Sequence, residues 1–599
     1  MLRSSEQTPL LSSDSQHRPS YDSDRRAEEE DTALHGVDSN NRDDSQRRSS
    51  RWRETAIFAW ALLATAAVIV LAVIIQHGNA TKPGADPVPA AIAGASLEKS
   101  RHNSKRKRNL VFMVSDGMGP ASLSLTRSFR QHVEDLPIDD TLTLDRHFWG
   151  TSRTRSSSSL VTDSAAGATA FSCGRKSYNG AISMLPDHTP CGTVLEAAKR
   201  AGYATGLVVT TDITDATPAC FASHVDRREQ NDEIALQEVG EGCLGRTVDL
   251  MLGGGRCHFL PGSVHGGCRA DEIDVTKIAQ EKHGWTYADN RAAFDSLALG
   301  KNVSLPLLGL FAYYDVPFEI DRRNMADVYP SLSEMAITAL TALAEATKDS
   351  EKGFFLMIEG SRIDHAGHIN DPAAQVREVL EYDKTFKAVL EFLDANDAEG
   401  VLVATSDHET GGLATAYQGP SDVLPVYNWH PSILARANAS SEHLARLLAK
   451  QVSVHPDASI SSLKEWINST LVVPHLGITN ARDAELEALA NNPAAAIVLF
   501  AHMVSTRARI GWSTHGHSAV DVNIYSSGGG GADKLRGNVE NTQIGEFLRD
   551  YLSVEVEEIT QELRKGLGRD FAAGVTVEVE GGEYVSAVQD VHPLEWLHD

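Results

Sequence analysis

The sequence predicts an α/β fold, a three-layer sandwich with a mostly parallel central sheet. Residues 110–114, 354–358 and 401–404 are short apolar runs, typical of strands that are buried on both faces of a parallel sheet. Helical patterns separate these runs along the chain, as in α/β proteins. Each run is followed closely by acidic residues or a histidine, and α/β folds carry their sites at the carboxyl ends of their strands.

The remaining elements follow from the same two periodicities. Further strands are expected at residues 202–211, 248–252 and 518–525, and helices at 193–201, 331–346 and 371–392. Ser331 and Glu334 have the spacing of a capping box, and Pro372 suits the first position of the last helix. We assign these elements to one large folded domain at residues 109–560.

Two segments depart from the alternating pattern. Residues 413–510 are rich in Pro, Asn and Ala and contain short helical patterns, so we interpret them as an inserted subdomain. Residues 561–599 are expected to form a carboxyl-terminal tail that is open to processing. The last part of this tail alternates weakly, which also fits an edge strand.

The chain before residue 109 has three expected parts. Residues 1–54 are rich in Ser, Asp, Glu and Arg and carry too little apolar surface to fold, so we expect a disordered tail. Residues 55–75 are uncharged and long enough to cross a bilayer as a helix, with a buried core helix as the alternative. Residues 76–108 are expected to form a flexible stalk.

Charges and sequons predict the orientation of this membrane helix. Arginines precede it at positions 47, 48, 51 and 53. Only Lys82 carries a positive charge within about 20 residues after it, so the tail should be cytosolic and the folded domain lumenal or extracellular. All N-glycosylation sequons follow the helix, at Asn79, Asn302, Asn438 and Asn468.

The six cysteines also follow the helix, where an oxidising compartment allows disulfide bonds. We expect Cys257 and Cys268 to pair because they would close a short glycine-rich loop. In the cytosolic tail, Glu6, Leu10 and Leu11 have the spacing of acidic dileucine signals. Sorting adaptors read such signals, although so short a pattern also arises by chance.

The composition argues against a function in binding DNA or RNA. The net charge is −26, whereas proteins that bind DNA or RNA usually present a basic face. The hydrophobic fraction of 42% supports a large buried core. We therefore expect the chemistry at the strand ends of the folded domain.

Residues 161–167 lead from a polar loop into a helix of small residues. Ser164 lies at the expected helix start, where backbone N–H groups and the helix dipole can hold an anion beside an oxygen nucleophile. The alternative is an ordinary N-cap, in which Asp163 or Ser164 only satisfies the first turn. This stretch alone favours the N-cap.

Acidic residues and histidines gather at the expected strand ends. The candidates are Asp116, Asp364, His368, Asp407, His408, His515 and His517. Asp364 and His368 are four residues apart and would share one face of a helical turn. Each residue alone is more often structural, because such side chains satisfy loop backbone groups. Together they form a set of nitrogen and oxygen ligands that suits zinc.

The order of the motifs resembles that of the alkaline phosphatases over residues 108–555. The motifs are Asp116-Gly-Met-Gly, Thr162-Asp-Ser-Ala-Ala166, Asp215-Ala-Thr-Pro218, Glu359-Gly, Ile363-Asp364 with His368, Asp407-His408, and Gly516-His517 with Val520-Asp-Val522. The resemblance implies hydrolysis of phosphate monoesters through a phosphoserine at Ser164. It also implies two Zn²⁺ ions, the first held by Asp364, His368 and His517 and the second by Asp116, Asp407 and His408. The implied ligands of one Mg²⁺ are Asp116, Asp215, Thr217 and Glu359.

The family pattern further implies a phosphate-binding arginine thirteen residues after Asp215, which is Arg228. Arg227 is the alternative if the register shifts by one. Asp163 becomes a candidate to orient Arg228. We prefer His517 to His515 as the ligand because only His517 fits the pattern Gly-His-x-small-Val-Asp-Val.

Two alternative functions predict different residues at these positions. A phosphodiesterase or pyrophosphatase on the same scaffold would tend to use Thr as nucleophile and lack the magnesium residues. An inactive membrane glycoprotein that serves as an interaction partner would show gaps among the ligands, and the sequence shows none. The expected topology makes the chain most similar to the fungal vacuolar branch of the family. The resemblance thus implies a single-pass type II protein of the vacuole membrane, with a lumenal catalytic domain, and a homodimer.

Overall fold

The computed structural model describes residues 107–419 and 424–572. The expected cytosolic tail, the membrane helix at 55–75 and the stalk up to residue 106 lie outside the described residues, as do residues 573–599. Nothing in the structure therefore tests those predictions.

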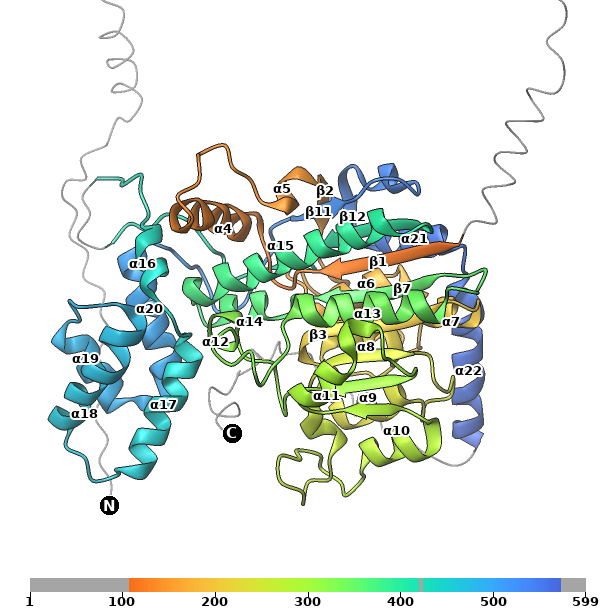
Figure 1. Ribbon diagram of the computed structural model, residues 1–599, viewed down its shortest axis with the longest axis horizontal. Helices are drawn as coiled ribbons and strands as arrows, with labels where there is room; N and C mark the ends of the chain where they lie inside the picture. The colour runs from red at the N-terminus through yellow and green to blue at the C-terminus, as the bar shows by residue number, and fades with distance from the viewer. Residues whose placement is uncertain (1–106, 420–423, 573–599) are drawn as a thin grey trace, which may run out of the picture. The chain divides into compact units, whose positions relative to one another are not determined.

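A sheet forms the centre of the described region (Figure 1). It has ten strands in the order β12-β2-β11-β8-β1-β7-β3-β4-β6-β5. Strand β1 (Arg108–Val114) lies between β7 (Phe354–Glu359) and β8 (Glu399–Thr405) and runs parallel to both. Strand β11 (Val522–Ser526) is antiparallel to β8 and to β2 (Phe148–Arg153), and the other pairings in this sheet are parallel. The other strands are β3 (Ala204–Asp212), β4 (Leu250–Gly254), β5 (Thr286–Ala288), β6 (Leu307–Leu310) and β12 (Gly537–Glu540). The expected α/β class with a mostly parallel sheet is confirmed.

Alternate residues of the buried strands face two separate apolar layers, because successive side chains point to opposite faces of a sheet. In β1, Phe112 belongs to one layer and Val111 and Met113 to the other. The first layer is covered by α6 (Ser164–Cys173), α7 (Val194–Arg200), α21 (Asn541–Leu552) and α22 (Val556–Ala572). The second is covered by α13 (Leu332–Ala346) and α15 (Pro372–Ala395), which lie across the sheet in Figure 1.

The helix starts match the expected capping chemistry. The Ser331 side chain accepts a hydrogen bond from the Glu334 N–H, and the Glu334 side chain accepts one from the Ser331 N–H, which confirms the capping box of α13. Pro372 is the first residue of α15.

Helix α22 corrects the expected end of the domain at residue 560. The helix continues through Ala572, and its Ile559 and Leu563 are buried in the first apolar layer. The expected tail at 561–599 therefore starts too early, because an amphipathic helix with a buried face crosses that boundary.

A group of helices follows β9 (Glu409–Thr410) and precedes β10 (His517–Ser518), in the segment that we interpreted as an insertion. Its members are α16 (Pro431–Arg436), α17 (Ser441–Val454), α18 (Ile460–Trp466), η4 (Ile467–Leu476), α19 (Asp483–Asn491), η5 (Pro493–Ala495) and α20 (Ala496–Ala508). These helices share a hydrophobic cluster around Leu444, Leu471 and Phe500, which extends to α4 (Pro120–Val133) and the start of α15.

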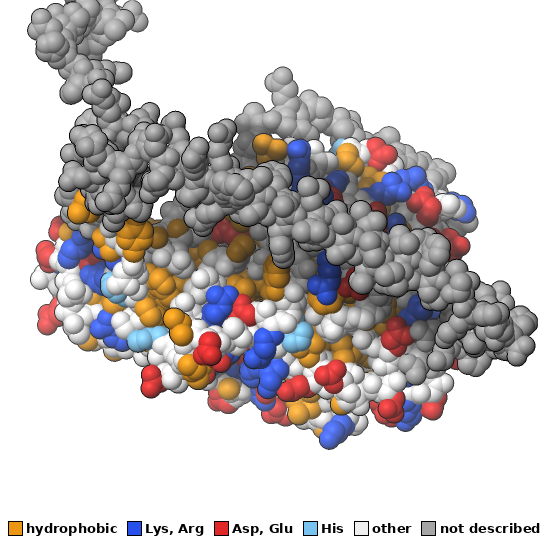
Figure 2. Space-filling model, turned by 90° about the horizontal axis from the view of Figure 1, so that it is seen from above, with side chains coloured by type: hydrophobic (Ala, Val, Ile, Leu, Met, Phe, Trp, Pro, Cys, Tyr) orange, Lys and Arg blue, Asp and Glu red, His pale blue; other side chains and the backbone are white. Residues whose placement is uncertain are grey.

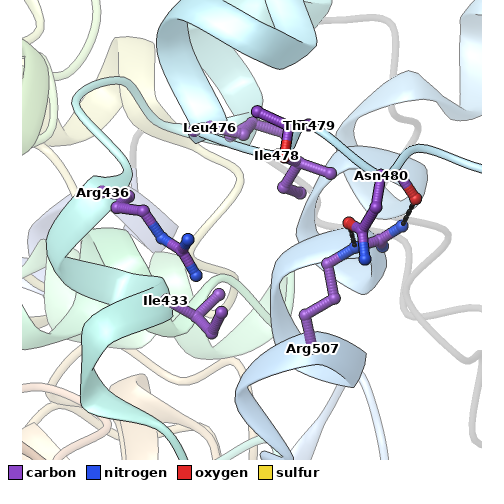
Figure 3. Close-up of a pocket in the computed structure, with 8 residues that line it drawn as sticks. Ile433, Arg436, Leu476, Ile478, Thr479, Asn480 and Arg507 are labelled. Atoms are coloured by element: carbon purple, nitrogen blue, oxygen red, sulfur yellow. Dashed lines mark hydrogen bonds between the residues drawn. The ribbon is translucent and has the colours of Figure 1, made fainter.

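A pocket of about 290 Å³ lies within this helical group (Figure 3). It is lined by Ile433, Arg436, Leu476, Gly477, Ile478, Thr479, Asn480 and Arg507. The guanidinium of Arg507 donates to both carboxylate oxygens of Glu485 and to Asn480, so its charge is already neutralised. The pocket shares no residue with the site at the sheet edge.

On the face shown in Figure 2, basic side chains are interspersed with acidic ones. Within residues 107–419 and 424–572, no single helix is long and apolar enough to cross a membrane. Two consecutive helical segments, Asp483–Asn491 and Pro493–Ala508, are together long and apolar enough to cross a membrane, but the chain bends by 110° between them.

Candidate active site

The carboxyl ends of four neighbouring strands bring polar side chains to one edge of the sheet. Asp116 follows β1, Asp215 follows β3, Glu359 ends β7, and Asp407 with His408 follows β8. Parallel strands end at the same edge, so these residues lie close together despite their separation in sequence.

A first cluster combines α14 (Arg362–His368) with β10. Asp364 Oδ2 lies 3.2 Å from His368 Nε2, as the four-residue spacing on one helix predicts. His517 Nε2 lies 3.5 Å from Asp364 Oδ1 and 3.1 Å from His368 Nε2. The three side chains each offer a ligand atom within 4.8 Å of the others, which is the geometry of a metal site.

A second cluster consists of Asp116, Asp407 and His408, all buried, with ligand atoms within the same limit. His408 Nε2 lies 3.1 Å from Asp407 Oδ2 and 3.6 Å from Asp116 Oδ1. The two clusters adjoin, because the rings of His408 and His517 stack with their centroids 3.5 Å apart. The structure thus brings together the two triplets that the resemblance implied for zinc.

The chemistry of these residues fits bound cations. Three buried oxygens of the predicted ligands have no hydrogen-bond partner among the described residues: Asp116 Oδ1, Thr217 Oγ1 and Glu359 Oε1. Burial raises the pKa of Asp116 well above its usual value, and the charges of Asp407 and Asp364 raise it further. Burial likewise raises the pKa of Glu359 to about 8. So many buried carboxylates can ionise together only if positive charge balances them.

The histidines are oriented by backbone carbonyls. His517 Nδ1 lies 2.8 Å from Thr162 O, and His368 Nδ1 bonds to His515 O. When the Nδ1–H group of each ring donates to the carbonyl, Nε2 keeps its lone pair and faces the cluster. This is the usual arrangement of histidine ligands. Burial and the nearby His408 lower the pKa of His517 to about 3, so its ring is neutral, as a metal ligand must be.

His515 and His517 occupy different places. His515 is exposed, and its Nδ1 lies 2.7 Å from the backbone oxygen of His368. It therefore supports the first cluster from outside, whereas His517 is part of it.

Ser164 is the first residue of α6, and Asp163 is the N-cap. Asp163 Oδ1 accepts a hydrogen bond from the Ala166 N–H at 3.0 Å, so the Ser164 hydroxyl is not needed as a cap. Ser164 Oγ lies instead 3.0 Å from His408 Nε2, beside the second cluster. Gly167 permits this approach of helix and strand end, because an added Cβ would lie only 3.0 Å from Asp407 Cβ.

Arg228 faces the same place, whereas its neighbour Arg227 is exposed. Arg228 Nη2 donates to Asp215 Oδ1 at 2.7 Å, and Nη1 lies 3.7 Å from Asp163 Oδ2. Burial alone would lower the pKa of Arg228, but Asp215 and Asp163 raise it above its usual value, so the guanidinium stays charged. The expected partnership of Asp163 with Arg228 is present in the geometry.

Three features were missed from the sequence. Thr410 Oγ1 donates to Asp364 Oδ1, and Ser361 Oγ donates to Glu359 Oε2 at 2.6 Å. Thr410 stands two residues after His408, and Ser361 stands two residues after Glu359. This proximity to a predicted ligand was the only feature of the sequence that could have indicated their roles. The third is the disulfide Cys173–Cys191, which joins residues 18 positions apart.

The expected disulfide Cys257–Cys268 is confirmed. His258 lies close to these two sulfurs and could complete a metal-binding triplet with them. The disulfide bond excludes that role, because only thiolates bind metals well.

Comparisons with known proteins agree with this geometry. The family model for alkaline phosphatase matches residues 107–554. The repressible alkaline phosphatase of Saccharomyces cerevisiae is 53% identical over 83% of this chain and 89% of that protein, and the alkaline phosphatase of Schizosaccharomyces pombe is 47% identical over 78% and 86%. The crystal structure of Thermus thermophilus alkaline phosphatase superimposes with a TM-score of 0.62 at 30% identity, over 77% of this chain and 96% of that one. The chain therefore belongs to the alkaline phosphatase family and is a metal-binding phosphatase that acts on phosphate monoesters.

Proposed function

We propose that this phosphatase works through a phosphoserine on Ser164, at a site that holds two Zn²⁺ and one Mg²⁺. The observation that carries the proposal is the position of Ser164 Oγ, 3.0 Å from His408 and beside the clustered ligands. The start of α6 adds the positive end of a helix dipole, which favours a phosphate there.

The metal assignments follow the two clusters and the unpartnered oxygens. Asp364, His368 and His517 would hold one zinc, and Asp116, Asp407 and His408 the other. Asp116, Asp215, Thr217 and Glu359 would hold magnesium. When bound, these cations supply the positive charge that stabilises oxygen atoms as they become negative.

The chain's own residues have distinct roles in this proposal. Arg228 holds two phosphate oxygens with a planar fork of N–H groups, a geometry that lysine cannot offer. Asp163 and Asp215 fix that fork. The Ser164 oxygen attacks phosphorus, the ester P–O bond breaks, and the alcohol leaves. Water then attacks the phosphoserine, which releases inorganic phosphate and restores the Ser164 hydroxyl.

The test is an assay of the purified full-length chain on an aryl phosphate with zinc and magnesium. Ser164→Ala should lower kcat by at least about 1,000-fold, because loss of a nucleophile removes the covalent route. Ser157→Ala, at an exposed serine of the preceding loop, is the matched control and should retain activity. Activity of Ser164→Ala equal to that of the native chain would contradict the proposal.

We also propose a type II topology in the vacuole membrane, a lumenal catalytic domain and a homodimer. The uncharged segment 55–75, the arginines before it and the sequons after it support the topology. Glu6, Leu10 and Leu11 would then be exposed to a cytosolic sorting adaptor. Protease treatment of sealed vacuoles should digest the tail and spare the catalytic domain, and digestion of that domain without detergent would contradict the topology. Light scattering of the detergent-solubilised chain tests the dimer.

A further inference from the structure

A tight turn at residues 178–181, in which the Ala181 N–H donates to the Tyr178 carbonyl, lies against the loop that precedes Ser164. The N–H of Asn179 donates to Ser158 Oγ at 3.0 Å, and its side-chain amide donates to Val161 O at 3.2 Å. The Ser177 carbonyl accepts the N–H of Ser157 at 2.8 Å. One side of the turn is therefore attached to the segment that ends at the nucleophile.

The peptide groups of Gly180 connect the start of α6 with the arginine. The Gly180 N–H donates to Asp163 Oδ2 at 2.7 Å, and the Gly180 carbonyl accepts the Arg228 N–H at 2.8 Å. Gly180 has φ +90°, a conformation that residues with a Cβ rarely adopt. Gly180 thus binds both the Asp163 side chain and the Arg228 backbone, and it fixes the distance between them.

Tyr178 adds a side-chain connection to the same segment. Its hydroxyl donates to Asp226 Oδ1 at 2.8 Å, and His188 Nδ1 lies 2.9 Å from the same oxygen. Asp226 stands two residues before Arg228. Val225, just before Asp226, pairs with Ile182, just after the turn, through an isolated antiparallel bridge.

These contacts matter because a bidentate fork depends strongly on its position. Among the described residues, the side chain of Arg228 is held closely at one nitrogen, 2.7 Å from Asp215, whereas Asp163 lies 3.7 Å away. The backbone of Arg228 must therefore supply part of the alignment. A residue that holds the phosphate group equally before and during reaction contributes uniform binding, and loss of uniform binding raises KM while kcat stays unchanged.

We propose that Tyr178 and Asp226 are positioning residues: together with the Gly180 peptides they fix the backbone of Arg228, and so set the affinity of the site for phosphate. The inference rests on the role assigned to Arg228 in the proposed function. It predicts that loss of the Tyr178–Asp226 hydrogen bond acts through Arg228 and not through the fold as a whole.

The experiment measures inhibition by inorganic phosphate and turnover of an aryl phosphate by the metal-loaded full-length chain. Tyr178→Phe and Asp226→Asn should each raise the Ki for phosphate and the KM about 3- to 10-fold, the size expected for one hydrogen bond, with kcat within about twofold. Gly180→Ala should raise both further, because the turn must change its backbone conformation. Asp187→Asn is the control, since this exposed carboxylate lies beside His188 and accepts hydrogen bonds within its own turn, from Thr189.

A double variant separates positioning from general destabilisation. In an Arg228→Ala background, Tyr178→Phe should leave the already raised Ki unchanged, because its effect passes through the missing arginine. An unchanged Ki in the single variants, or an equal increase with and without Arg228, would overturn the inference. Those results leave the proposed function standing if Ser164→Ala is inactive. A native Ki in Arg228→Ala alone would instead overturn the role of Arg228, and the inference with it.

Discussion

Asp163 and Ser164 divide two tasks between adjacent positions at the start of α6. The Asp163 carboxylate accepts the N–H groups of Ala166 and Gly180 on its two oxygens and faces Arg228 as well. Because the helix start is satisfied by Asp163, the Ser164 hydroxyl is left for the cluster at His408. The N-cap interpretation and the nucleophile interpretation of this stretch are therefore compatible, because Asp163 caps the helix and leaves the Ser164 hydroxyl available for the proposed attack.

A buried carboxylate outside the site gives a prediction about stability and pH. Glu238 in α9 (Asn231–Val239) is fully buried, and neither of its oxygens has a hydrogen-bond partner among the residues described. Burial raises its pKa well above the usual value. The folded state therefore prefers the protonated acid, which favours folding at low pH. That contribution is lost as the pH rises from the unfolded pKa through the higher folded one.

Glu238→Gln keeps the shape of the side chain without a charge. We expect its Tm to equal that of the native chain near pH 4 and to exceed it at pH 8 by at least about 2–4 °C, which corresponds to about 1 kcal/mol in a domain of this size. Thermal melting across this pH range makes the measurement. Glu351→Gln, at an exposed position, should show no such divergence, and parallel curves for Glu238→Gln and the native chain would refute the prediction.

At the residue scale, the predictable part of the site is the part held on regular elements. Asp116, Glu359 and Asp407 could be found because each stands at the end of an apolar run, and Asp364 with His368 because of helical spacing. Gly180 and the Tyr178–Asp226 contact could not, because their bonds join a turn to segments distant in sequence. Backbone donors leave no pattern of side chains from which such contacts can be inferred.

At the element scale, the central strands could be predicted from the sequence, whereas strands near one edge of the sheet could not. Strands β1, β7 and β8 lie within two residues of the expected positions, because burial on both faces imposes an unbroken apolar run. Strands β2 and β12, near one edge, were not expected. Both mix exposed polar residues with a glycine, and β12 is only four residues long. Neither strand therefore shows an alternating pattern or a continuous apolar run.

Helix α22 provides the prediction at this scale, because the sequence placed its second half outside the domain. Leu563 is only 4% exposed and packs in the layer that covers the sheet. Leu563→Ala should lower the free energy of unfolding by about 2–4 kcal/mol, the usual cost of a buried leucine truncation, without changing kcat per folded molecule. Denaturant melting measures the loss. Glu558→Ala, on the exposed side of the same helix, should cost far less, and equal losses in both variants would show that α22 is not part of the core.

At the scale of the whole molecule, the site joins distant parts of the chain. Its ligand candidates stand between Asp116, after the first strand, and His517, after the helical group. Convergence on one sheet edge follows from the parallel topology, since crossover helices return each strand to the same direction. The composition contributes as well, because a chain with net charge −26 has concentrated several of its carboxylates in one buried place.

This concentration of charge predicts that metal ions stabilise the whole domain and not only the reaction. Removal of metals leaves the carboxylates of Asp116, Asp364 and Asp407 buried near one another, so the chelated protein should melt at a lower temperature and lose activity. Readdition of zinc and magnesium should restore both, with a gain of about 2.7 kcal/mol when free metal is about 100 times its Kd. His368→Ala should reduce the rise of Tm on titration with zinc, because it removes one ligand of the first cluster. His132→Ala, at an exposed histidine of α4, should keep the full response. A Tm that is indifferent to chelation would show that the buried carboxylates are neutralised by protons rather than by cations.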